Sequence, residues 1–175
     1  MSTTRNLHKK TFKDRIKKIG RCIRSSILCI RFPFLYIKEY DYPDEKLEFD
    51  WRIWKYIPEF TWLDDMPDGW RKNFGIQLCK DIRKELIKNH FLFKYRIVQI
   101  KEKFGGLRWY DEGAPGKVHE IIEDYASRSY YVCINCGKDA TKFTTGWICP
   151  YCDDCIPEGR PYREIKPKNK VKNKI

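Results

Sequence analysis

Four cysteines near the C-terminal end of the chain follow the spacing C-x2-C-x15-C-x2-C, which limits the possible folds more than any other feature. The first pair, Cys133 and Cys136, lies in the segment CINCG, where Gly137 allows the backbone to turn sharply behind the two sulfurs. The second pair is Cys152 and Cys155. Two pairs at this spacing are typical of a tetrahedral zinc site whose four thiolates leave no position open for water. The sequence therefore predicts one structural zinc ion.

A fifth cysteine leaves the second pair ambiguous. Cys149 and Cys152, in CPYC, have the same separation as Cys152 and Cys155, so Cys149 could replace Cys152 or Cys155 as a ligand. We prefer Cys152 with Cys155 and treat Cys149 as a spare thiol. The alternative for the whole cluster is that its cysteines are small core residues or form disulfides. The remaining cysteines, Cys22, Cys29 and Cys79, are scattered among apolar positions.

Neither a membrane span nor a secretory signal is recognisable in the N-terminal residues, so we predict a reducing cytoplasmic location, where disulfides are rare. The most apolar stretch, residues 27–37, has about half the length needed to cross a bilayer and is interrupted by Arg31 and Pro33. The basic N-terminal residues are not followed by an apolar segment with a small-residue cleavage site, as a secretory signal would be.

Upstream of the cysteines, the apolar pattern predicts an α+β fold in the order helix, β-hairpin, helix. Residues 69–89 form the first predicted helix, because apolar residues recur there at every fourth position. Residues 91–110, rich in β-branched and aromatic side chains, read as a hairpin with a glycine pair at its turn. The second helix begins near residue 117 and leads into the cysteines. Its predicted buried face consists of Val118, Ile121, Ile122, Tyr125, Ala126 and Ser129.

The hairpin segment QIKEKFGGLRWY places several cations close together. A two-residue loop at Gly105 and Gly106 would set Lys103 opposite Arg108, a like-charge pair that a phosphate or a partner's carboxylate would relieve. The alternative, which involves no ligand, is an edge strand whose lysines protect it against aggregation. Alternation puts Val98, Ile100, Glu102, Phe104, Leu107 and Trp109 on an apolar face. The other face carries Gln99, Lys101, Lys103, Arg108 and Tyr110.

Glu102 is the misfit on the apolar face, and we expect it at the rim or paired with a cation such as Arg83. The predicted domains are an N-terminal extension at residues 1–65 that is basic, partly helical and then acidic, and a core at residues 66–132. A zinc knuckle or ribbon at residues 133–158 packs on this core, and residues 159–175 form a basic disordered tail.

An isoleucine stripe runs along a predicted basic amphipathic helix in the extension. Its members are Ile16, Ile19, Ile23, Ile27 and Ile30. Such a helix could bind RNA or a membrane surface, but we favour docking of this stripe on the core. The acidic residues 39–68 are expected to fold back on the basic segment.

Several of these segments together resemble an uncharacterised family of small proteins of bacteriophages, prophages and their hosts. The resemblance covers about residues 66–156: GW at 69–70, LC at 78–79, QIKEKFGGLRWY, a helix, CINCG, GW at 146–147 and the last cysteine pair. In the family pattern a tryptophan stands five residues before that pair, which Trp147 and Cys152 match, so the resemblance favours Cys152 with Cys155. It implies a phage or prophage setting, and hence the host cytoplasm, without an activity.

The histidines give little support to enzyme chemistry, so we predict a non-enzymatic protein. His8, His90 and His119 are scattered, and none lies between the cysteine pairs as in a zinc-framed HNH nuclease. His119 beside Glu120 reads as a solvated pair. The chain also has no glycine loop of the kind that cradles phosphates.

Three binding functions remain as expectations. With a formal net charge of +12, the chain suits polyanion partners. The first is nucleic acid, with phosphates at Lys101, Lys103 and Arg108 and a base stacked on Tyr110 or Trp109. The second is a host protein whose acidic side chains meet the same hairpin. The third is attachment to a membrane surface through residues 15–37.

Overall fold

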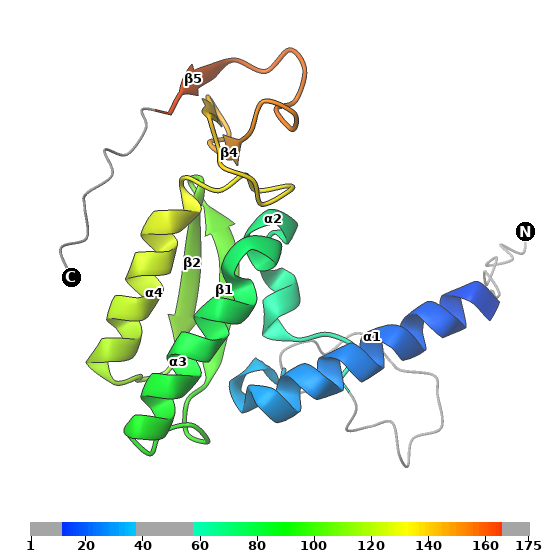
Figure 1. Cartoon of the computed structure of the whole chain (residues 1–175), viewed down its shortest axis with the longest axis vertical. Helices are drawn as coiled ribbons and strands as arrows, with labels where there is room; N and C mark the ends of the chain where they lie inside the picture. Colours follow the sequence, from blue (N-terminus) through cyan, green and yellow to red (C-terminus); the bar gives the residue numbers. More distant parts are fainter. Residues whose placement is uncertain (1–11, 38–57, 166–175) are drawn as a thin grey trace, which may run out of the picture.

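The computed structural model describes residues 12–37 and 58–165, which form the predicted α+β fold (Figure 1). Predictions for residues 1–11, 38–57 and 166–175 lie outside the described residues. In chain order the elements are α1 (Phe12–Arg31), η1 (Pro33–Leu35), η4 (Trp62–Asp65), α2 (Asp68–Trp70), η5 (Arg71–Gly75), α3 (Ile76–Lys88), β1 (Ile97–Lys103), β2 (Gly106–Asp111), α4 (Gly116–Ser129), β3 (Lys142–Thr144), β4 (Pro150–Tyr151) and β5 (Tyr162–Glu164).

The first predicted helix is present as one helical run over residues 68–88, made of α2, the π-helical turn η5 and α3. Its apolar stripe faces the core, because side chains spaced four apart lie on one side of a helix. The π turn departs from the regular helix expected from sequence. The buried stripe consists of Trp70, Phe74, Leu78, Ile82 and Leu86.

The hairpin of β1 and β2 lies behind α3 and α4 in Figure 1, and the two helices also contact each other. Ile100, Leu107 and Trp109 are buried, as predicted for the apolar face of the hairpin. Val118 and Ile122 of α4 are buried as well. Strand β1 begins at Ile97, later than the predicted start at residue 91.

The predicted hairpin register is wrong by two residues. The turn residues are Phe104 and Gly105, with φ of 54° and 77°, instead of Gly105 and Gly106. Two consecutive positive φ angles define a type I′ turn, which matches the twist of the strands. Lys101 therefore lies opposite Arg108, and Lys103 lies opposite Gly106. A shift of two residues leaves each side chain on its predicted face, apart from the residues at the ends of β1.

Three predictions for the apolar face need correction. Val98 is the extra residue of a β-bulge, since the register shifts between Ile97 and Gln99, and it is 50% exposed. Phe104 lies in the turn and is 66% exposed. Glu102 is half-buried, consistent with the expected rim position, but it does not pair with Arg83. Its carboxylate accepts a hydrogen bond of 2.6 Å from the backbone N–H of Gly105 and so closes the turn.

The core begins before residue 66, contrary to the predicted domain boundary. Phe32, Phe34 and Leu35 are buried in the same cluster as the helices and the hairpin. Phe34 packs edge-on against Tyr95, with ring centroids 5.5 Å apart. The residues of η4 also enter this cluster, and η4 lies against β1. The N-terminal segments therefore complete the core instead of only extending it.

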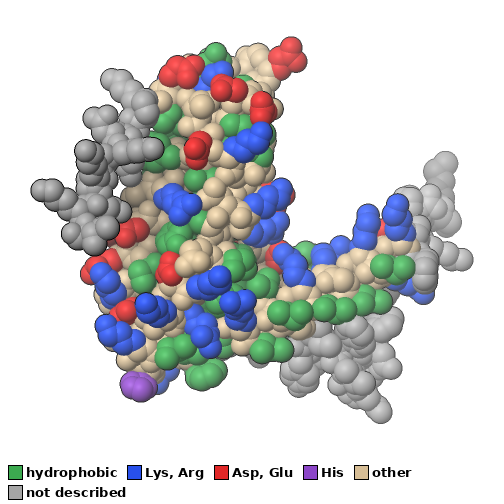
Figure 2. Space-filling model, viewed as in Figure 1, with side chains coloured by type: hydrophobic (Ala, Val, Ile, Leu, Met, Phe, Trp, Pro, Cys, Tyr) green, Lys and Arg blue, Asp and Glu red, His purple; other side chains and the backbone are tan. Residues whose placement is uncertain are grey.

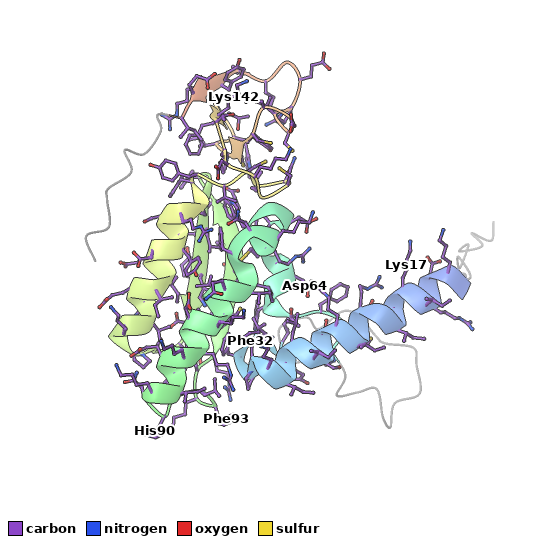
Figure 3. The ribbon with its side chains drawn as sticks, viewed as in Figure 1. Lys17, Phe32, Asp64, His90, Phe93 and Lys142 are labelled. Atoms are coloured by element: carbon purple, nitrogen blue, oxygen red, sulfur yellow. The ribbon has the colours of Figure 1, made fainter. Side chains whose placement is uncertain are left out.

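Helix α1 docks with the side opposite to the predicted one. Cys22 and Ser25 are buried, and the Ser25 hydroxyl donates a 2.9 Å hydrogen bond to the carbonyl of Glu59. Arg21 binds the Glu59 carboxylate, and Arg24 binds that of Asp64, which lies between the core and α1 in Figure 3. The described part of the acidic segment thus contacts α1, as expected. The isoleucine stripe remains exposed, with side chains from 48% to 83% accessible.

Residues 133–165 form the cysteine module. It contains a three-stranded antiparallel sheet in the order β4, β3, β5 (Figure 1). Strand β5 pairs with β3, so residues 162–164 belong to the module and not to the predicted disordered tail. Within residues 12–37 and 58–165, every helix is too short or too polar to cross a membrane.

Candidate metal centre and basic hairpin face

The thiols of Cys133, Cys136, Cys152 and Cys155 converge in the cysteine module. Their Sγ atoms all lie within 4.8 Å of one another, and those of Cys136 and Cys152 are 3.5 Å apart. Four thiolates bound at about 2.3 Å to one zinc ion stand about 3.8 Å apart, so the cluster has the dimensions of a tetrahedral site. The arrangement can hold one metal ion with four sulfur ligands and a closed coordination shell.

Cys149 is not a member of this cluster. Its backbone N–H donates a 3.0 Å hydrogen bond to the hydroxyl of Thr144, and the same hydroxyl donates to the carbonyl of Trp147 at 2.6 Å. The side chain of Cys149 is buried, and burial raises its thiol pKa to about 11. Cys149 thus packs in the turn between β3 and β4. All the cysteines are free thiols rather than disulfides.

The four clustered sulfurs are too close to ionise independently. Burial opposes ionisation of Cys133, but backbone N–H groups of Cys136, Cys152 and Asn135 lower its pKa to about 7. Burial and the hydrogen bond with the Cys136 sulfur raise the pKa of Cys152, and the same causes raise that of Cys155 to about 12. A divalent cation would remove the repulsion that prevents four thiolates from forming together.

Backbone carbonyls of the first cysteine loop receive hydrogen bonds from α2. The N–H of Gly69 donates to the carbonyl of Ile134 at 2.8 Å, and the indole N–H of Trp70 donates to that of Val132 at 2.9 Å. A Cβ atom at Gly69 would lie 2.1 Å from the carbonyl oxygen of Cys133. Gly69 and Trp70 therefore hold the first cysteine loop, residues 132–137, against α2, a role that the sequence pattern did not indicate.

The π turn adds a third anchor. Asn73 lies in η5, and its side-chain amide donates a 2.7 Å hydrogen bond to the carbonyl of Gly137. Its own oxygen accepts a 2.9 Å hydrogen bond from Arg128 of α4. A π turn rotates the following side chains relative to a regular helix. Asn73 thereby links α4, the helical run and the first cysteine loop.

The tip of the hairpin also contacts the cysteine module. A Cβ atom at Gly105 would lie 3.2 Å from the Ile148 side chain and carbonyl and 3.4 Å from the Phe143 ring. A Cβ atom at Gly106 would lie 2.5 Å from the ring and hydroxyl of Tyr130, at the end of α4. The glycine pair therefore allows close packing at the joint between core and module, beyond its part in the turn.

The structure brings the five predicted binding residues together on the outer hairpin face. Gln99, Lys103 and Tyr110 are exposed, while Lys101 and Arg108 are half-buried. The Lys101 ammonium lies 5.3 Å from the centre of the Tyr110 ring, within the range of a cation–π contact.

Other side chains near this face differ in their contacts and exposure. Arg108 donates to the Leu107 carbonyl at 3.0 Å and to the Tyr130 hydroxyl at 3.4 Å. Trp109, predicted as a possible stacking residue, is 7% exposed and donates to the hydroxyl of Tyr95 at 2.9 Å. It is therefore a core residue. Phe104 was not predicted as a binding residue, although it stands exposed at the tip beside the Lys103 ammonium.

His119 does not form the predicted pair with Glu120. Its Nε2 atom lies 3.1 Å from Asp111, while Glu120 binds Lys117. Asp111 also accepts a 3.2 Å hydrogen bond from the hydroxyl of Tyr95, which is buried. These contacts tie the start of α4 to the end of the hairpin, which is a structural role.

Comparisons of the chain with protein-family models, with curated proteins and with solved structures found no match.

Proposed function

We propose that this chain is a non-enzymatic, zinc-stabilised protein that binds the phosphates of nucleic acid through the outer face of its hairpin. The resemblance of its central motif to phage and prophage proteins supports a mobile-element setting in the host cytoplasm. The proposal has two parts, the identity of the metal and the ligand of the hairpin face, and each rests on its own observation.

Zinc is the proposed metal because four thiolates in a closed tetrahedral cluster are typical of structural zinc sites. The N–H groups directed at the Cys133 sulfur stabilise its thiolate, which is the form that binds metal. Metal analysis of the purified protein should find one zinc ion per chain. A Cys152→Ser variant should lose this ion, and Cys149→Ser should retain it.

The pattern of ion pairing carries the nucleic-acid proposal. On α1, Lys18, Arg21 and Arg24 are each bound to a carboxylate of Glu59 or Asp64. By contrast, none of the three hairpin cations forms an ion pair with a carboxylate of the described residues. The cations of the hairpin face therefore keep their charge available for an outside anion.

The hairpin register also brings two of these cations together. Lys101 and Arg108 stand directly opposite each other, and like charges in this position destabilise a hairpin by roughly 0.2–1 kcal/mol. A phosphate between them would remove the repulsion. Tyr110, which is 42% exposed, offers a ring for base stacking beside these cations.

Binding of fluorescently labelled single-stranded and duplex oligonucleotides, measured by anisotropy over a series of salt concentrations, tests this function. Replacing Lys101, Lys103 and Arg108 with alanine should reduce the slope of log K against log salt by about 2–3, since each phosphate contact contributes about 0.7–0.9. A control in which Lys13, Lys17 and Lys88 become alanine removes the same charge elsewhere. Equal slopes for the two triple variants would contradict the proposal.

A host protein as the true partner would show itself in an affinity purification with and without nuclease. A defined protein that survives nuclease treatment, and that the hairpin variant fails to recover, would replace nucleic acid by an acidic protein surface.

The exposed isoleucine stripe of α1 favours membrane-surface attachment as a second candidate function. It forms a row of hydrophobic side chains along the helix in Figure 2, on the side away from the core. The exposed cations Lys13, Arg15 and Arg31 flank it, which suits an anionic lipid surface. A shallow groove lined by Cys29, Pro33, Tyr36 and others continues the stripe from Ile30.

Flotation with phosphatidylserine vesicles tests this candidate. The full chain should float, and a variant with Ile19, Ile23 and Ile27 replaced by serine should remain at the bottom. Replacement of Ile76 and Ile87 by serine, which removes two exposed isoleucines from α3 instead of three from α1, is the control at another site. Flotation that is equal for all three proteins would contradict attachment through α1.

A further inference from the structure

A basic cavity lies where the end of α1 meets the middle of α3. Its volume is about 250 Å³. Figure 2 shows blue side chains gathered over this part of α3, and Figure 3 labels Phe32 at the same junction. Its lining consists of Arg31, Phe32, Lys80, Arg83, Lys84 and Ile87.

The charge of this cavity is of one sign. Four of its six lining residues are cations, and the lining contains no carboxylate. Within residues 12–37 and 58–165, none of these four forms an ion pair. A low-dielectric wall such as that made by Phe32 and Ile87 strengthens the field of charges beside it. Four cations without a carboxylate partner therefore give this hollow a positive surface, with the Arg31 guanidinium lying 5.4 Å from the centre of the Phe32 ring.

Arg83 supplies an independent observation. Its Nε atom is buried and has no hydrogen-bond acceptor, and it alone has this property among the buried side-chain nitrogens and oxygens of the described residues. Leaving such a donor unsatisfied is unfavourable in a folded protein, so an unpaired one needs an explanation. Arg83 lines the cavity, and a small rotation of its side chain would let an acceptor oxygen there provide the missing partner.

We propose that this cavity binds the phosphate group of a small organic phosphate monoester. Phosphate suits the site because its dianion matches several cations at once and its oxygens accept hydrogen bonds from a guanidinium. Ile87, which is exposed at the cavity, offers an apolar surface for the organic part of the ligand. The cavity is smaller than the roughly 300–1,000 Å³ typical of sites for drug-sized molecules, which limits the ligand to a small one.

Two-dimensional NMR of the 15N-labelled full chain tests the site directly, because a buried arginine Nε–H gives its own resonance. Inorganic phosphate and phenyl phosphate would be titrated separately, with sodium chloride adjusted to constant ionic strength. Both should shift the Arg83 resonance in a saturable way, with the tighter binding for phenyl phosphate. A linear or absent shift with both anions would overturn the proposal. Tighter binding of inorganic phosphate would overturn the assignment to an organic ester.

Variants at the exposed lysines keep the test independent of folding. Lys80→Ala or Lys84→Ala should weaken phosphate binding about fivefold to tenfold, given the size of charge–charge terms at a partly exposed site. Lys88→Ala removes a charge from the same helix outside the cavity and should leave the affinity unchanged. The triple alanine variant of the hairpin should also bind phosphate normally. Equal weakening by Lys80→Ala and Lys88→Ala would show non-specific screening and would overturn the site.

Discussion

The hairpin–helix core and the cysteine module are stabilised in different ways. The core buries a continuous cluster that includes large side chains such as Trp70, Phe74 and Leu86. The module has three short strands, and its buried residues include Cys133, Cys149 and Cys152. Apolar burial holds the first region, whereas the second needs a cross-link, because so small a unit has little surface to bury. A metal ion bound by the four clustered cysteines should therefore determine the order of the module and leave the core largely intact.

The largest expected effect is that of metal removal. Structural zinc contributes apparent free energies of roughly 10–16 kcal/mol in zinc-finger peptides at neutral pH. Stripping the metal with a chelator should therefore unfold residues 133–165 and leave α3, α4 and the hairpin folded. Hydrogen exchange measured by NMR would separate the two regions. Loss of protection throughout the core at the same chelator concentration would contradict the division.

A core substitution should have the reverse effect. Ile82 is fully buried on α3, and truncation of a buried isoleucine to alanine costs about 2–5 kcal/mol. Ile82→Ala should lower the unfolding midpoint of the core by denaturant titration while the protein still binds one metal ion. Ile87→Ala, on the exposed side of the same helix, is the control. A loss of metal affinity as large as that of a ligand variant would refute the distinction.

Gly69 probes the joint between the two regions. A Cβ atom there would lie 2.1 Å from the carbonyl oxygen of Cys133, so Gly69→Ala forces the first cysteine loop to move. We expect a loss of about 1–3 kcal/mol, as for other overpacked sites, together with weaker metal binding in a competition assay. Gly20→Ala, in α1 with nothing within 4 Å of the added carbon, should be neutral or stabilising.

Phe104 should show a conflict between stability and binding. A bulky residue with φ of 54° is unfavourable, and type I′ turns prefer Asn followed by Gly. Phe104→Asn should therefore stabilise the chain by roughly 0.5–1 kcal/mol in thermal unfolding. If the exposed ring serves the hairpin face, the same variant should bind oligonucleotides more weakly. Unchanged stability would show that the turn carries no strain.

The smallest effect concerns the ion pairs that help to attach α1. Burial opposes ionisation of Glu59 and Asp64, but hydrogen bonds from Arg21, Lys18 and Arg24 lower the pKa of both carboxyls. Groups with a lowered folded-state pKa stabilise above their unfolded values of about 4 and lose this contribution as the pH falls below them.

The docking of α1 should accordingly weaken by about 0.2–1 kcal/mol below pH 4, in line with partly exposed ion pairs. The amide resonance of Ser25, followed by NMR between pH 6 and 3, reports this contact. An Arg24→Gln variant should reduce the pH dependence. A response that is unchanged in this variant would show that other groups control the docking.

The helices were predictable from sequence because their apolar residues repeat with the helical period, and the cysteine spacing indicated the cluster for a similar local reason. The hairpin register was not predictable. Gly106 looked like a turn residue, but the packing of Tyr130 against it requires glycine, and this contact comes from a distant part of the chain. The faces were nevertheless correct, since a shift of two residues preserves the alternation.

Long-range packing also explains the other differences. The isoleucine stripe of α1 had the pattern of a buried face, whereas Cys22, Ser25 and the pairs with Glu59 and Asp64 determine how the helix docks. The role of Phe34 depends on Tyr95, which is remote in sequence. The sequence suggested Arg83 only as a partner for Glu102, because a buried Nε atom without an acceptor becomes apparent only in the folded structure.

The contacts that fix the first cysteine loop involve the main-chain oxygens of Val132, Ile134 and Gly137. A carbonyl group is the same in every residue, so these bonds make no demand on the side chains of the loop. Evolution is therefore free to vary exposed positions such as Asn135 and Lys138, provided the turn and the sulfur ligands are kept. Relatives of this chain should diverge most at those positions and preserve the donors that hold the loop, namely Gly69, Trp70 and Asn73.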